Sequence, residues 1–251
     1  MNEQIIIDAL YKTNEALYKK IGGSDYASAI KKSGARVLKY RRYERGDHDA
    51  NLTVQQRRLL NIVADEAELN EACSNYCSIV IDMMAGRVGI SEVKTDNEEA
   101  NDWINGTLTR NNFEAVQGEW FRGAIRDRES FVTVDPQTAL WISEPAYDGY
   151  SGVVAIYDNI TGLPIWACKL WAETEPADVS GDAEDIGDED TVYLVVYQSN
   201  QITYWKASSG SSEVDPVMVD EGSLPMLESG NGYVWQLGLV PMVQFANKRD
   251  N

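Results

Sequence analysis

The sequence predicts an α+β fold in which N-terminal helices, including one long helix, pack on an antiparallel β-sheet. Up to about residue 128, apolar residues recur at the spacing of amphipathic helices, and beyond it they alternate with the period of two that is typical of strands. Because the helices precede the strands instead of alternating with them, the order favours α+β over α/β. We expect a basic helical arm over residues 1–50, a helical part over 51–128 and an antiparallel β part over 129–251.

The N-terminal arm is predicted to contain a short amphipathic helix and then a basic, aromatic stretch. Ile6, Leu10 and Leu17 fall near one face of a helix over residues 3–20, and Gly22-Gly23 ends it. The stretch that follows could bind nucleic acid or a partner through its basic side chains. These are Lys31, Lys32, Arg36, Lys39, Arg41, Arg42 and Arg45.

The long helix is predicted to begin at a capping box. Thr53 and Gln56 are spaced so that their side chains can satisfy two backbone N–H groups at the start of a helix. Apolar residues then keep a helical spacing from Leu59 to Met84, and Gly86 ends the pattern. We therefore expect one helix of many turns in this part of the chain.

Two shorter helices should follow. The first starts at Thr95-Asp96, and the second begins at Phe113 and ends near Arg126. In the first helix we expect a buried face made of Ala100, Trp103, Ile104 and Leu108. In the second we expect the inner residues to be Val116, Trp120, Phe121 and Ala124.

The β part contains eight segments with strand patterns, and we expect them to form one antiparallel sheet. Residues 158–162 have the composition of a loop between two strands, and Ser199-Asn200 is typical of a hairpin turn. The predicted strands are residues 130–134, 139–143, 153–157, 165–171, 191–198, 201–206, 233–236 and 242–245.

The charge is large and unevenly distributed. The chain has a net charge of −18, yet residues 1–60 hold 12 basic against 7 acidic side chains. An acidic body repels DNA phosphates, which excludes DNA binding over the general surface. The same charge is compatible with a protein that forms a wall past which DNA moves without binding. Residues 173–190 hold nine acidic and no basic side chains, which predicts a solvated, mobile loop. Their spacing does not match a calcium-binding EF-hand.

No catalytic, cofactor-binding or metal-binding residue is predicted, and we expect no enzyme. The sequence has neither a phosphate-binding glycine motif nor the nucleophile elbow of α/β-hydrolases. The single histidine, His48, is distant in sequence from Cys73, Cys77 and Cys168, which disfavours zinc. The cysteines suit small apolar positions in a reducing compartment. Neither a signal peptide nor a membrane-spanning run of apolar residues is recognisable.

Two alternative functions stay open at this point. Glu129, Asp135 and Glu144 lie near predicted strand ends, and the chain has seven tryptophans, so a carbohydrate-active enzyme or a sugar-binding β-domain is one alternative. A nucleic-acid-binding module is the other, since Tyr40 and Tyr43 accompany the basic stretch and could stack on bases. A solvated helix face would explain the same basic stretch without a ligand.

Several short motifs resemble those of portal proteins of long-tailed bacteriophages. Residues 40–48 resemble the family's Y-x-x-Y-x-x-G-x-H start, and residues 123–134 its helix-to-strand join, with Arg128 where the family has glycine. The other similar segments, in the family's order, are Asn75 to Asp82, Trp103 to Phe113, Glu144 to Trp171 and Leu239 to Lys248. These are scaffold motifs, built from turn residues and from aromatic residues of a helix-on-sheet core.

The resemblance implies a wing-like fold and a structural function. It implies a ring of about twelve copies at one capsid vertex of the virion, made in the bacterial host cytoplasm and used for genome packaging and ejection. The implied partners are other copies of the chain, terminase, capsid and scaffolding proteins and the head-completion or tail-adaptor proteins. Double-stranded DNA would pass through the ring. The family continues into a stem, a clip and a crown, so we expect this chain to be a wing fragment.

Overall fold

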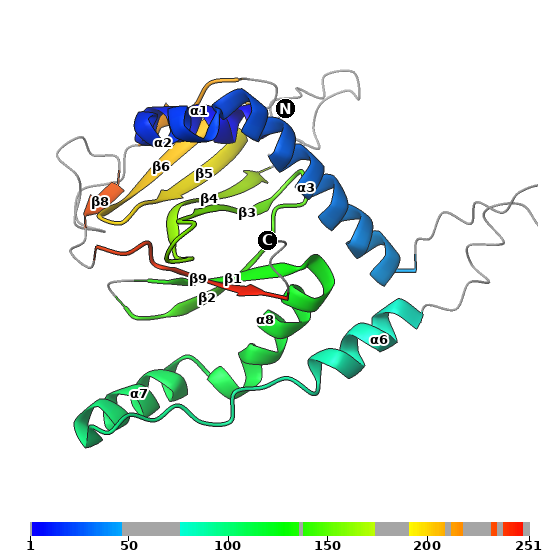
Figure 1. Cartoon of the computed structure of the whole chain (residues 1–251), viewed down its shortest axis with the longest axis vertical. Coiled ribbons are helices and arrows are strands. Elements are labelled where there is room, and N and C mark those ends of the chain that lie inside the picture. The colour runs from blue at the N-terminus through cyan, green and yellow to red at the C-terminus, as the bar shows by residue number, and fades with distance from the viewer. Residues whose placement is uncertain are drawn as a thin grey trace, which may run out of the picture.

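The fold is α+β, as the sequence predicts (Figure 1). The computed structural model describes residues 2–46, 76–135, 138–173, 191–208, 212–217, 232–234 and 238–247. The predicted long helix is described at its C-terminal end only, as α6 (Tyr76–Ala85), which stops directly before Gly86. Its predicted start at Thr53 and the acidic residues 174–190 lie outside the described residues.

The N-terminal segment forms three helices, the first two of which replace the single helix that the sequence predicted over residues 3–20. Asn14 divides that helix, because its side-chain oxygen accepts a hydrogen bond from the Leu17 backbone N–H at 3.0 Å and starts a new helix. Gly22, with φ +68°, then joins the second helix to the third. The three helices are α1 (Asn2–Thr13), α2 (Glu15–Ile21) and α3 (Gly23–Glu44).

The two shorter helices, α7 (Glu98–Arg110) and α8 (Phe113–Asp127), agree with the predicted spans to within three residues. The predicted start at Thr95-Asp96 precedes the observed cap, since Asn97 caps α7 by accepting a hydrogen bond from the Ala100 backbone N–H at 3.1 Å. Thr95 instead hydrogen-bonds Asn101 through its backbone.

The strands form two antiparallel sheets, not the single sheet that the sequence predicted. The small sheet has the order β2-β1-β9, and the large sheet has the order β3-β4-β5-β6-β7 with β8 also paired to β6. β7 was not predicted, since two residues are too short for a periodic pattern. The strands are β1 (Glu129–Val134), β2 (Trp141–Pro145), β3 (Gly152–Tyr157), β4 (Pro164–Glu173), β5 (Thr191–Tyr197), β6 (Gln201–Ser208), β7 (Asp215–Pro216), β8 (Gly232–Val234) and β9 (Met242–Ala246).

A tight turn between β2 and β3 divides the two sheets. Gly152 has φ +114°, and a Cβ atom at this position would lie 2.6 Å from the carbonyl oxygen of Ala146. Only glycine fits such a close approach without strain. The turn lets Ala146 pair with Val153 in a single parallel bridge, so the chain leaves the small sheet and begins the large one.

The core consists of layers, because both faces of each sheet are covered (Figure 1). On β4, Cys168 and Leu170 pack on α1, while the alternate residue Ala167 faces the small sheet. On β1, Phe131 faces the large sheet and Val132 faces α8. The isoleucines of α1 are fully buried in the core of the large sheet, so α1 is packed into the body although the sequence places it in an arm.

The two tryptophans that the sequence placed in the core differ in burial. Trp120 is buried, as predicted, with its ring centroid 5.4–5.9 Å from those of Phe113, Trp141 and Phe245. Trp103 is 68% exposed, so the predicted buried face of α7 is wrong at this residue. The buried residue of α7 is Thr107, near its C-terminal end, while its first turns project from the body (Figure 1).

No described helix is both long and apolar enough to cross a membrane.

Candidate functional site

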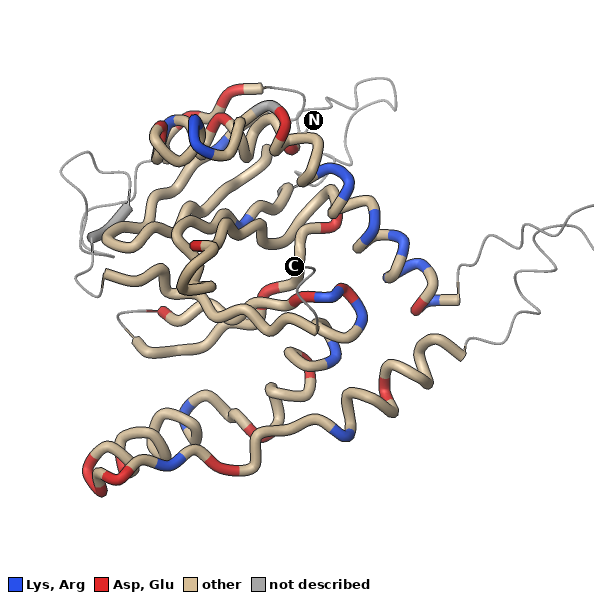
Figure 2. The backbone as a smooth tube through the Cα atoms, in the orientation of Figure 1, with Lys and Arg blue, Asp and Glu red and all other residues tan. Residues whose placement is uncertain are grey.

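Four of the predicted basic residues form an exposed row along α3, which we call the basic row (Figure 2). The opposite face of α3 is buried through Ile30, Gly34 and Val37, so helical geometry directs the remaining side chains to solvent. Arg45 is also exposed and donates a hydrogen bond back to the Arg41 carbonyl at 3.3 Å, whereas Arg42 is half-buried. The basic row consists of Lys31, Lys32, Arg36 and Lys39.

Arg41 does not belong to this exposed group, because its guanidinium lies inside the protein. It donates to the Asp127 carboxylate at 2.9 and 3.1 Å, to Asp148 at 2.6 Å and to the Ala146 carbonyl at 2.9 Å. Its side chain is 16% exposed and that of Asp127 is 1% exposed. Arg41 therefore holds α3 against α8 and against the turn after β2, and it has little capacity left for a partner.

The ion-pair network continues from Arg41 through α8 to α6. Arg126 pairs with Asp127 at 2.7 Å and with Glu44 at 2.8 Å, and Arg122 pairs with Glu44 and, at 2.8 Å, with Asp82. The hydrogen bond to Asp127 raises the pKa of Arg126, and the one to Asp82 raises the pKa of Arg122. This network fixes three helices relative to one another, which is a structural role.

Two of the carboxylates suggested for carbohydrate chemistry are held by structural partners. Glu144 is buried and accepts a hydrogen bond from Lys169 Nζ at 2.6 Å, which ties the small sheet to the large one. Burial nevertheless raises the pKa of Glu144. Asp135, at the end of β1, accepts a hydrogen bond from the Thr138 hydroxyl at 2.6 Å.

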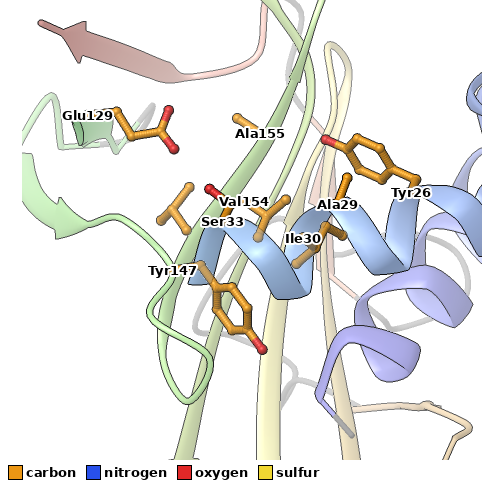
Figure 3. Close-up of a pocket in the computed structure, with 9 residues that line it drawn as sticks. Tyr26, Ala29, Ile30, Ser33, Glu129, Tyr147, Val154 and Ala155 are labelled. Carbon is orange, nitrogen blue, oxygen red and sulfur yellow. The ribbon is translucent and has the colours of Figure 1, made fainter. Parts of the chain in front are cut away.

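Glu129 lies at a small cavity of about 200 Å³ between α3, β1 and β3 (Figure 3). Gln244 donates a hydrogen bond to its carboxylate at 2.7 Å, and burial raises its pKa. Burial also raises the pKa of Tyr26, on the wall of the cavity, to about 12. Glu129 is the single carboxylate among the lining residues, which include no tryptophan. Glycoside hydrolysis needs two carboxylates, so this cavity does not favour the carbohydrate-active alternative.

The described cysteines occupy apolar surroundings. Cys168 is fully buried on β4 and burial raises the pKa of its thiol, while Cys77 is half-buried on α6. Cys73 and His48, which the sequence analysis considered together with these cysteines, lie outside the described residues. Among the described residues, no three histidine, cysteine, aspartate or glutamate side chains are grouped as metal ligands.

Two exposed apolar surfaces among the described residues were missed by the sequence analysis. A groove of about 370 Å³, the α7 groove, runs between α7, α8 and the small sheet, and Trp103 and Ile104 form part of its wall. The second surface, the α6 stripe, consists of exposed residues on one face of α6: Tyr76, Ile79, Val80, Met83 and Met84. The signal for the stripe is in the sequence, because α6 is apolar around nearly its whole circumference and only one face can pack inward.

A comparison of the chain with protein-family models found no match, and a comparison with curated proteins found no significant relative.

Proposed function

We propose that this chain is a structural component of a bacteriophage portal vertex, corresponding to the outer wing of a portal protein. The observation that carries the proposal is the pair of exposed apolar surfaces, the α6 stripe and the α7 groove. Contiguous apolar surface on a folded protein is typical of sites that bind other proteins. A component that works by assembling with copies of itself and with other head proteins requires such surfaces.

The residues that carry the resemblance to portal proteins support a scaffold role. Gly123 lies where α8 packs on β1, and a Cβ atom there would be 3.0 Å from the Ser130 side chain. Asp158 shapes the turn between β3 and β4, where its carboxylate accepts from the backbone N–H groups of Ile160 and Thr161 at 2.6 and 3.2 Å. Pro241 leads into β9, which pairs with β1. These residues lie at turns and packing contacts that connect the elements of the body.

In this proposal the chain meets further copies of itself in a ring, and the ring serves terminase, capsid and scaffolding proteins and the head-completion proteins. The net charge of −18 supports a ring through which double-stranded DNA moves, because an acidic surface does not retain phosphates.

The test is whether the chain is part of phage particles. Cells that encode the chain are induced to release particles, the particles are purified, and their proteins are quantified by mass spectrometry. A copy number far below that of the major capsid protein, together with antibody labelling at a single vertex, is the expected result. Purified particles that lack the chain would overturn the proposal.

A further inference from the structure

The α6 stripe has the spacing of a helix that binds in a groove. Its residues follow one another at i, i+3, i+4, i+7 and i+8, and their side chains are 49–70% exposed. Cys77 and Ile81 are half-buried on the side of α6 that faces α3 and α8, and Tyr76 and Val80 of the stripe also line the hollow between these helices. An amphipathic helix that docks in a partner's groove presents anchors at these positions, and methionines adapt well to an apolar wall.

The α7 groove offers a surface of the matching kind. Its walls are almost wholly apolar, and the exposed ring of Trp103 lies at its edge. The same helix carries four exposed acidic side chains at and before its first turns, which we call the acidic tip: Asp96, Glu98, Glu99 and Asp102. A partner that fills the groove therefore needs an apolar helix with basic side chains nearby.

The chain itself has an apolar helix with basic side chains nearby, on the side away from the α7 groove. The basic row of α3 lies on the side of the molecule where α6 lies, and α3 packs against α6. The acidic end of α7 lies on the far side (Figure 2). One copy cannot bring its own two sides together, but two copies can.

We infer that the α6 stripe of one copy docks in the α7 groove of the next copy, with the basic row facing the acidic tip. The inference rests on the proposed function and names the surfaces through which neighbouring copies meet. Because the two surfaces differ, the contact is heterologous, and repeated contacts of this kind close into a ring or continue as a filament. Salt screens the contact between the basic row and the acidic tip, so this charged part contributes most at low ionic strength.

The test uses three matched variants that each place an aspartate at an exposed apolar position. Met83→Asp alters the stripe and Trp103→Asp alters the groove. Ile160→Asp is the control, since Ile160 is 95% exposed on the loop between β3 and β4, away from both surfaces. Circular dichroism and thermal melting confirm that each variant is folded. Sedimentation velocity is then measured over a range of concentrations at about 0.05 M and about 0.5 M salt.

We expect wild type and Ile160→Asp to form species larger than dimers at low salt and to associate less strongly at high salt. Met83→Asp and Trp103→Asp should each weaken association by about tenfold or more. An equimolar mixture of these two variants should form dimers and nothing larger, since each dimer has one intact stripe and one intact groove. Together with the larger species of the wild type, this result identifies a heterologous contact.

A second set of variants tests the charged part without altering apolar residues. Lys31→Glu with Lys32→Glu should weaken association, and mixing that protein with a Glu98→Lys, Glu99→Lys protein should restore it, because the reversed charges then face each other.

The inference is overturned if wild type stays monomeric at low salt and high concentration, or if the mixture of the two aspartate variants fails to form dimers. It is also overturned if Met83→Asp assembles as well as the control. These results leave the particle test untouched: a chain present in particles whose Met83→Asp variant still assembles keeps the proposed function and loses this interface. A chain that assembles as described but is missing from particles keeps this interface and loses the proposed function.

Discussion

Arg128 joins α8 to β1 in a backbone conformation that favours glycine. Its φ is +76°, in the left-handed region, where a residue with a Cβ atom is disfavoured by roughly 1 kcal/mol or more. We predict that Arg128→Gly raises the free energy of unfolding by about 0.5–1 kcal/mol in urea denaturation. Arg128→Ala keeps the strained backbone and should give no gain. Equal gains from both substitutions would assign the effect to the guanidinium instead of the backbone.

Arg41 illustrates how a residue of the basic stretch serves the fold. Removing its side chain leaves the buried Asp127 carboxylate with fewer donors. We expect Arg41→Ala to lower the free energy of unfolding by about 2–4 kcal/mol. Lys31→Ala, on the exposed side of the same helix, should change it by less than about 0.5 kcal/mol. Similar effects from the two substitutions would contradict the burial of Arg41.

Glu129 should make stability depend on pH. Burial raises its pKa above the ordinary value of 4.5, so the folded protein binds the proton more tightly than the unfolded chain. Its contribution to stability therefore falls as pH rises from about 4.5 through the raised pKa. Glu129→Gln cannot ionise, so its stability relative to wild type should increase across this window and then level off, measured by urea denaturation at stepped pH. A relative stability that decreases would show that Gln244 and Arg36 outweigh burial.

At the scale of single elements, the two tryptophans of α7 and α8 give a direct comparison. Trp120→Ala removes a buried ring from the aromatic cluster and should lower the free energy of unfolding by about 3–5 kcal/mol. Trp103→Ala removes a largely exposed ring and should lower it by less than about 1 kcal/mol. Thermal and urea unfolding of both variants measure this. A large loss for Trp103→Ala would mean that the ring packs within the body.

The elements themselves were largely predictable, because periodicity is a local property. The helix that carries Trp120 follows from apolar spacing, and the hairpin at Ser199-Asn200 follows from its turn residues. The structure confirms both. The assignment of helix faces was less secure. The spacing of Trp103 and its apolar neighbours indicates an apolar face on α7. A face that packs inward and a face that stays exposed have the same period, so spacing alone does not distinguish them.

The division into two sheets was not predictable, nor was which basic side chains are buried and which are exposed, since both depend on contacts between distant segments. Alternation along β2 and β3 is the same in one sheet or two, and the separation depends on the turn at Gly152. Arg41 and Lys31 look alike in sequence. They differ because Arg41 meets Asp127 and Asp148, which lie 86 and 107 residues further along the chain.

At the scale of the whole molecule, the charge distribution predicts that the chain does not bind DNA. The basic row is short, and the net charge of −18 repels phosphates. We predict that a short labelled duplex shows no saturable binding in fluorescence anisotropy at about 0.15 M salt. Saturable binding that is lost in the Lys31→Glu, Lys32→Glu variant would instead make α3 a DNA-contacting helix.

The burial of α1 under the large sheet has a consequence for the order of folding. Asp8 and Lys12 hydrogen-bond the backbone of Val214 at 2.9 and 2.6 Å, and the Thr13 carbonyl accepts from Gln198 at 3.0 Å. At ribosomal speeds of about 5–20 residues per second, these partners emerge roughly 10–40 seconds after α1. The face of α1 that packs on the large sheet therefore stays without its partners until the strands are synthesised, while α2 and α3, which also pack on α1, follow it directly.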